Sequence, residues 1–135
     1  MGQERRNSQK LCVKCLRGSS SVQKSIFSKI IDRELPADIV YETPSIIVIK
    51  NIKPVAPVHY LIIPKLAIAD MKDPRLDAAL AAEMVATVQY LAAQLPGDQS
   101  FNIVSNNGVA AGQSVMHMHW HFVSGKNLYE NGMTL

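Results

Sequence analysis

The feature that most constrains this chain is a row of alternating histidines near its carboxyl end, His117, His119 and His121. Successive side chains of a β-strand point to opposite faces, so a strand over residues 115–123 would place all three imidazoles on one face. Neighbouring imidazoles would lie about 6.5–7 Å apart, because a strand rises ~3.3 Å per residue. The other face would be apolar and would carry Met118, Trp120 and Phe122.

Three interpretations of this row compete. It can be a polar strand face without function, although it holds three of the four histidines of the chain. It can be a zinc or iron site completed by His59, since alternate histidines on a strand can both ligate a metal. Such sites usually recruit a carboxylate or a soft ligand, and the stretch from Asp98 to Gly125 contains no other acidic residue. The third interpretation is a nucleophilic site that acts on phosphorus.

The loop before the histidines favours the nucleophilic interpretation. It runs from Asn106 to Ser114 and contains Gly108 and Gly112. Its backbone N–H groups, the Ser114 hydroxyl and the Gln113 amide can converge on an anion. Imidazole is mostly neutral at pH 7 because its unperturbed pKa is ~6.5, and neighbouring histidines can orient it and stabilise charge. The sequence therefore predicts nucleophilic catalysis on a bound phosphate, without a metal or other cofactor.

Hydrophobic spacing predicts the remaining elements. They are a helix over 25–31 behind a Ser25 cap, strands over 39–41, 46–49, 59–63 and 101–105, and a long helix ended by Pro96 and Gly97. Asp73 followed by Pro74 predicts the start of the long helix, because proline suits the first helical position. Its apolar face carries Leu76, Leu80, Met84, Val88, Leu91 and Leu95. Strands joined by short turns predict an antiparallel sheet and the α+β fold class.

The 135 residues have room for one domain, and a composition with 47% hydrophobic and 19% charged residues is ordinary for a globular protein. No apolar run approaches the ~20 residues that span a bilayer, so we expect a cytoplasmic protein without membrane contact. Positive charge gathers in residues 1–24, where six basic side chains stand against one acidic residue. The rest of the chain has eight basic and ten acidic residues, which argues against nucleic acid as a partner.

Residues 1–24 show no periodicity, and Gly18 to Ser21 form a low-complexity boundary. We therefore predict a disordered basic tail and a folded domain over 25–135. The tail loosely fits an organelle-targeting segment, but a plain disordered extension is favoured. Cys12 and Cys15 form an isolated CxxC without the further ligands that a structural zinc site needs, and we interpret them as reduced thiols.

The segment from Ala111 to Val123 resembles the signature of the histidine triad family, three histidines separated by hydrophobic residues after an AGQSV lead-in. Residues 26–37 and 57–65 resemble the Hint branch of that family, the purine nucleoside phosphoramidases. The resemblance covers about residues 25–125. It implies a five-stranded antiparallel sheet with two helices in each protomer, and a homodimer with one continuous sheet.

The resemblance also implies roles for individual residues. His119 would attack the α-phosphorus and form a nucleotidylyl-histidine, which water would hydrolyse to the nucleoside 5′-monophosphate. His117 and His121 would position it and contact the phosphate, and His59 would support the row. Phosphate and leaving-group contacts would fall on Ser114, Gln113, Gly112 and Asn106. Purine-pocket positions would fall on Ile26, Phe27, Ile30, Ile49 and Ile52, for which core packing is an equally good interpretation.

The chain departs from the family pattern in three places. Asn51 stands where an aspartate usually grips the ribose, and an amide lacks the charge that strengthens such hydrogen bonds. Ser25, Ser28 and Ala67 stand where many bacterial relatives have zinc-binding residues. The segment after Gly125 does not match the usual carboxyl end. Two other functions stay open, a dinucleoside polyphosphate hydrolase like the Fhit branch and a nucleotide-binding regulatory protein with incidental turnover.

Overall fold

The structure is a computed structural model that describes residues 24–132 of the chain. The predicted basic tail, with Cys12 and Cys15, lies outside these residues except for Lys24. The ammonium group of Lys24 lies 2.7 Å from a carboxylate oxygen of Asp32 and also pairs with Glu34. Within the described residues, no helix is long and apolar enough to cross a membrane.

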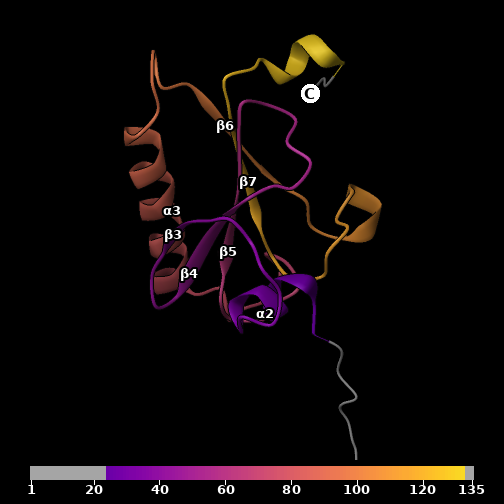
Figure 1. The fold of residues 1–135 in the computed structure, drawn as a ribbon. Helices are drawn as coiled ribbons and strands as arrows, with labels where there is room; N and C mark the ends of the chain where they lie inside the picture. Colours follow the sequence, from indigo (N-terminus) through magenta and orange to yellow (C-terminus); the bar gives the residue numbers. More distant parts are fainter. Residues whose placement is uncertain (1–23, 133–135) are drawn as a thin grey trace, which may run out of the picture.

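A five-stranded antiparallel sheet forms the centre of the molecule (Figure 1). Its strands, in spatial order, are β3 (Ile39–Glu42), β4 (Ile46–Lys50), β5 (Val58–Pro64), β7 (Trp120–Ser124) and β6 (Phe101–Ser105). The β3–β4 turn is held by Thr43, whose hydroxyl oxygen accepts the backbone N–H groups of Ser45 and Ile46. Consecutive pairing of short strands confirms the predicted α+β fold.

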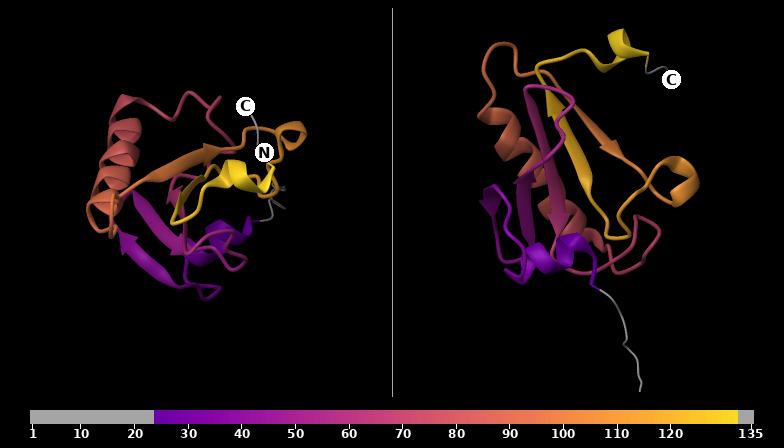
Figure 2. Two further views of the ribbon diagram at one scale, coloured as in Figure 1. Left: turned by 90° about the horizontal axis from the view of Figure 1, so that it is seen from above. Right: turned by 45° about the vertical axis from the view of Figure 1, so that its right-hand side comes forward.

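The two helices cover opposite faces of the sheet, as the view from above in Figure 2 shows. The long helix α3 (Ala78–Ala93) buries Met84 and Leu91 against one face. The short helix α2 (Ile26–Ile31) buries Phe27 and Ile30 against the other. Strand residues alternate between the two resulting cores, which are Ile46, Val48, Ile62, Met118 and Phe122 under α3 and Ile47, Ile49, Leu61 and Ile63 under α2. The histidines share the α2 face.

The helix α2 confirms the predicted Ser25 cap, since the Ser25 hydroxyl accepts the N–H of Ser28 at 3.0 Å. The predicted start of the long helix was wrong. Asp73 accepts the N–H and side-chain Nε–H of Arg75 in a local turn, whereas Asp77 caps α3 by accepting the N–H of Leu80 at 2.9 Å. Both aspartates are good caps in isolation, so sequence pattern alone could not choose between them.

The predicted strand over residues 115–123 was also too long, because β7 begins only at Trp120. Its last partner on β5 is Ile62, and Pro64 has no N–H with which to extend the ladder. The chain before Trp120 instead turns toward the β5–α3 connection, where the N–H of Met118 donates to the carbonyl of Ile68 at 2.8 Å. His121 therefore lies in a strand, while His117 and His119 lie in the segment that leads into it.

Candidate active site

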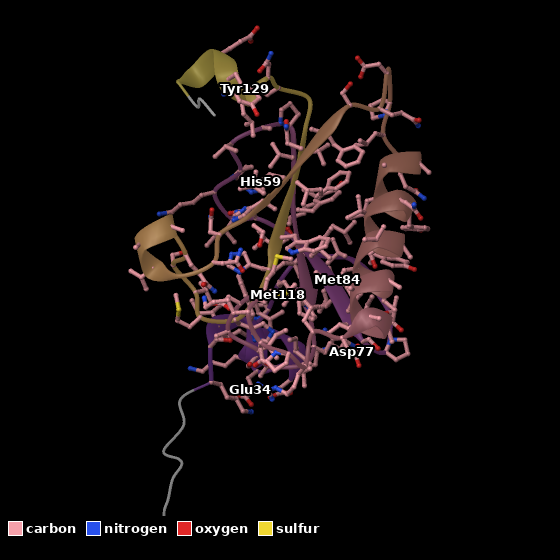
Figure 3. The ribbon with its side chains drawn as sticks, turned by 180° about the vertical axis from the view of Figure 1, so that it is seen from behind. Glu34, His59, Asp77, Met84, Met118 and Tyr129 are labelled. Atoms are coloured by element: carbon pink, nitrogen blue, oxygen red, sulfur yellow. The ribbon has the colours of Figure 1, made fainter. Side chains whose placement is uncertain are left out.

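The four histidines gather on the sheet face that α2 covers. His59 of β5 and His121 of β7 lie diagonally across two paired strands, since Leu61 pairs with His121 and His59 with Val123. Their ring centroids are 5.1 Å apart, and those of His119 and His121 are 5.2 Å apart. Figure 3 shows His59 on the side of the sheet away from Met84 of α3. The predicted separation into an imidazole face and an apolar face holds even where the strand does not.

His119 has a defined tautomer. Its Nδ1 lies 2.8 Å from the backbone carbonyl oxygen of His117, and a carbonyl can only accept a hydrogen bond. Nδ1 therefore carries the hydrogen, and the lone pair of the neutral ring is on Nε2. Within residues 24–132, Nε2 of His119 has no hydrogen-bond partner. An unprotonated, unpaired imidazole nitrogen is the form that a nucleophile requires.

His117 is held at both ring nitrogens and is 1% exposed. Its Nε2 donates to the carbonyl oxygen of Pro64 at 2.8 Å, which leaves the lone pair on Nδ1. The hydroxyl oxygens of Ser25 and Ser28 both lie 3.3 Å from Nδ1. Both nitrogens of this ring are thus occupied within the protein, and His117 contacts His119 through its backbone carbonyl.

His59 and His121 form a hydrogen-bonded pair in which the donor and the acceptor can be assigned. The backbone N–H of Val55 donates to Nδ1 of His59 at 3.1 Å, so the hydrogen of the neutral ring is on Nε2. That Nε2 lies 2.9 Å from Nδ1 of His121 and donates to it. The remaining hydrogen of His121 is then on its own Nε2. His121 thus keeps one N–H donor for an anion, next to the lone pair of His119.

Burial lowers the pKa of every histidine in the group. Loss of solvation is the main cause for His119 and His117, and hydrogen bonds to backbone carbonyls partly oppose it. Loss of solvation also lowers the pKa of His59. For His121 it acts together with the like charges that His119 and His59 would carry, and the pKa falls to about 4. All four rings are therefore neutral at pH 7, as the hydrogen-bond directions require.

The loop over residues 106–114 has a firm internal structure. The side-chain oxygen of Gln113 accepts the N–H of Gly108 at 2.8 Å, and its amide nitrogen donates to the carbonyls of Ala69 and Val115. Gln113 is buried, so these contacts occupy the amide that we predicted to face phosphate. The structure gives it the role of holding the loop. Gly112 has a φ of 96°, a conformation that favours glycine.

The other predicted phosphate contacts are accessible. Ser114 and Gly112 are exposed, and Asn106 is half-buried. A Cβ on Gly112 would lie 4.0 Å from Cγ of Asn106, which places that side chain beside the turn. No hydrogen bond within residues 24–132 ties Ser114 to a histidine. The structure thus leaves these three residues free to meet a ligand but does not place them around one.

Asn51 is half-buried and contacts the histidine group. Its side-chain oxygen accepts the N–H of Lys53 at 2.9 Å, and its Nδ2 lies 3.1 Å from Nε2 of His59. Since Nε2 of His59 carries a hydrogen, this contact brings two donors together. If the amide oxygen and nitrogen of Asn51 were exchanged, the NH2 group would face the N–H of Lys53, and two donors would again meet.

The predicted purine-pocket residues are divided. Phe27 is buried and presents its ring at 78° to that of His119, with centroids 4.9 Å apart. Ile30 and Ile49 are buried in the same core. Ile26 is 56% exposed and Ile52 is 93% exposed, so these two face solvent. Phe27 therefore packs against His119, whereas the exposed Ile26 and Ile52 lie outside this core.

The family model described as the HIT domain matches residues 32–128, which include the paired strands and all four histidines. This chain belongs to the HIT family. A member from Escherichia coli named purine nucleoside phosphoramidase is 35% identical over 108 residues, covering 78% of this chain and 91% of that protein. An uncharacterized HIT-like protein of Synechococcus elongatus is 41% identical over 107 residues, covering 78% and 94%.

Solved structures agree with the HIT fold. A HIT family hydrolase from Clostridium thermocellum superposes with a TM-score of 0.73 at 39% identity, covering 79% of this chain and 95% of that one. The histidine triad resemblance read from the sequence is confirmed, and the chain is similar to HIT hydrolases over most of its length.

Sequence reasoning missed several residues of this HIT site. From the sequence, Ser25 was predicted only as a helix cap, and both Ser25 and Ser28 only as replacements for zinc ligands, yet both hydroxyls lie against His117. The carbonyl of Pro64 and the N–H of Val55 fix the tautomers of His117 and His59 through the backbone, which no side-chain pattern reveals. Among residues 24–132, no three histidine, cysteine, aspartate or glutamate side chains are grouped so that they could hold a metal ion.

Proposed function

We propose that this HIT protein hydrolyses the P–N bond of nucleoside phosphoramidates and releases a nucleoside 5′-monophosphate. The observation that carries the proposal is the tautomer of His119, whose Nδ1 hydrogen is bound to the carbonyl of His117 and whose Nε2 lone pair is free. A neutral, fixed imidazole is ready to attack phosphorus without prior loss of a proton.

The reaction proceeds in two steps at His119. Nε2 attacks the α-phosphorus, a nucleotidylyl-histidine forms, and the bond from phosphorus to nitrogen breaks as the leaving amine takes a proton from solvent. Water then attacks the same phosphorus and gives a proton back to solvent, the bond to His119 breaks with its electron pair returning to Nε2, and the monophosphate leaves. The N–H of His121 donates to a phosphate oxygen and stabilises the charge that develops there, while His59 holds the ring of His121 from behind. Ser114, Gly112 and Asn106 supply further donors from the loop.

A purine nucleotide is the proposed substrate. The support is the name of the Escherichia coli relative, together with the aromatic edge of Phe27 against His119 and the open side chain of Ile26. A planar base presents an apolar face that packs well on such side chains. A cytoplasmic location and the absence of nucleic-acid partners stay predictions from the sequence.

A homodimer with a continuous sheet is part of the proposal. β6 is an edge strand that pairs only with β7 within residues 24–132, and it carries the exposed apolar side chains Phe101 and Ile103. An unpaired edge with apolar side chains favours pairing with another strand. Size-exclusion chromatography with light scattering tests this directly, since the monomer mass is 14.9 kDa.

Side-by-side hydrolysis of adenosine 5′-phosphoramidate and diadenosine polyphosphate tests the activity. We expect a higher kcat/KM for the phosphoramidate and no turnover of it by His119→Ala. A higher kcat/KM for the dinucleotide would replace the proposal with a polyphosphate hydrolase. Retained AMP binding in calorimetry without turnover of either compound would identify a nucleotide-binding protein instead.

A further inference from the structure

Two hydroxyl groups of the first turn of α2 converge on one buried imidazole nitrogen. The Oγ atoms of Ser25 and Ser28 each lie 3.3 Å from Nδ1 of His117, and 3.3 Å from each other. The two serines are separated from His117 by about 90 residues of chain, and only the packing of α2 onto the sheet brings them together. We call these three residues the serine–histidine cluster.

The direction of these hydrogen bonds is fixed. Nε2 of His117 donates to the Pro64 carbonyl, so Nδ1 can only accept. The Ser25 oxygen accepts the N–H of Ser28 as the helix cap, and its one hydrogen is shared between Nδ1 of His117 and the Ser28 oxygen, each 3.3 Å away. His117 is 1% exposed, whereas Ser25 and Ser28 are half-buried, so the hydroxyls stand between its ring nitrogen and the solvent side of the helix. A buried acceptor without a donor carries a free-energy cost.

The cluster is connected to the nucleophile through the backbone of His117. The carbonyl oxygen of His117 accepts the Nδ1 hydrogen of His119, which holds the lone pair on Nε2. The ring of Phe27, also in α2, lies nearly perpendicular to the rings of His119 and His117, with centroids 4.9 and 6.1 Å away. The helix therefore contacts the histidine row both at a ring nitrogen and through an aromatic side chain.

We propose that Ser25 and Ser28 are positioning residues, which hold His117 so that its carbonyl orients His119 for attack. This inference rests on the proposed function and deepens it. Neither serine touches the reacting atoms. Their contribution is a smaller range of orientations for the nucleophile, and small misplacements of reacting groups slow catalysis strongly.

Ser28 offers the cleanest test, because its hydroxyl does not cap the helix. Ser28→Ala removes one donor from the cluster and should lower kcat by about tenfold, with KM for adenosine 5′-phosphoramidate changed by less than about twofold. Ser28→Thr keeps the hydroxyl and should restore most of kcat. Asp77→Ala is the control for a general loss of stability, since it removes the cap of α3, which packs on the other face of the sheet from the cluster. It should lower Tm and leave kcat unchanged.

Ser25 allows a second test with a matched pair. Ser25→Asn and Ser25→Asp both keep a side-chain oxygen for the cap, but only the amide can also donate to Nδ1 of His117. Ser25→Asn should retain more activity than Ser25→Asp. The carboxylate draws a proton onto Nδ1, so Ser25→Asp should also raise the pKa of His117 in a histidine NMR titration.

A measurement that does not require turnover tests the serine–histidine cluster separately from the proposed function. The ¹⁵N resonance of Nδ1 in His117 should shift in Ser28→Ala and return in Ser28→Thr. If the wild type hydrolyses no phosphoramidate, the proposed function fails, and an unchanged Nδ1 resonance in Ser28→Ala would independently overturn the cluster. Full kcat in Ser28→Ala, or equal activity of Ser25→Asn and Ser25→Asp, would overturn the positioning role.

Discussion

Nδ2 of Asn51 lies 3.1 Å from Nε2 of His59, and both nitrogens carry hydrogen in the neutral protein. The backbone decides this, because the N–H of Lys53 binds the Asn51 oxygen and the N–H of Val55 binds the other nitrogen of His59. A carboxylate at position 51 would accept from Lys53 with one oxygen, and with the other it would share the Nε2 hydrogen of His59 with Nδ1 of His121.

Asn51→Asp should therefore strengthen this contact. We expect the pKa of His59 to rise, because the carboxylate favours the charged ring, and the free energy of unfolding at pH 7 to increase by about 1 kcal/mol. NMR titration and urea denaturation measure the two effects. Asn107→Asp is the control, since the Asn107 amide donates to Ser105 and a carboxylate cannot. It should destabilise the protein and leave the pKa of His59 unchanged.

The same substitution tests whether position 51 meets the ribose. If it does, Asn51→Asp should tighten AMP binding in calorimetry by about 1 kcal/mol, since hydrogen bonds to charged groups are stronger than neutral ones. Because the amide contacts Lys53 and His59, equal affinities would mean that position 51 acts on the histidines only.

His119→Ala should lower kcat by several powers of ten, because each ~1.4 kcal/mol of lost transition-state stabilisation is tenfold. His121→Ala and His117→Ala should slow turnover less, since neither forms the bond to phosphorus. Mass spectrometry of the wild type with a slowly hydrolysed analogue, without acid, should find a nucleotidyl adduct on the peptide that contains His119. An adduct on a different histidine would reassign the nucleophile.

Acidification should destabilise the folded protein. The pKa of His121 is about 4 in the folded state, against ~6.5 for an unfolded histidine, and the pKa values of His59, His117 and His119 are also lowered. Between these values the unfolded chain binds more protons than the folded one, so the free energy of unfolding falls as pH falls from about 7 toward 4. Urea titrations at pH 7.5 and 5 measure this. His121→Gln should show a weaker pH dependence, and a wild-type stability that is constant over this range would contradict the prediction.

Gly125→Ala should destabilise the turn that follows β7. Gly125 has a φ of 91°, and a Cβ there would lie 3.0 Å from Cγ of Pro57. Gly97→Ala is the matched control, because its φ is 67° and no atom lies within 4 Å of a new Cβ. Both variants carry left-handed backbone strain of about 1–2 kcal/mol, so the extra loss in Gly125→Ala measures the clash with Pro57. Equal losses in urea denaturation would show that Pro57 moves aside.

Local sequence patterns were sufficient to predict most of the helices and strands. The alternation around Met118 and Phe122 and the four-residue steps of α3 come from the geometry of strands and helices, which neighbouring residues set. The predicted element bounds were wrong where two residues were equally good helix caps, as with Asp73 and Asp77. They were also wrong where a residue distant in sequence determined the extent of a strand. The start of β7 at Trp120 depends on Pro64 across the sheet, and no pattern near residue 120 contains that information.

The sequence by itself determined that three imidazoles share one face beside an exposed loop, because side-chain direction along an extended chain alternates by covalent geometry. Only the tertiary structure decided which nitrogen of each imidazole carries its hydrogen. Those assignments depend on the carbonyls of His117 and Pro64 and on the N–H of Val55. Backbone groups are the same in every residue, so a sequence cannot say which one will meet a ring. The tertiary fold decides which backbone group meets each ring, and it thereby places the lone pair of His119 on Nε2.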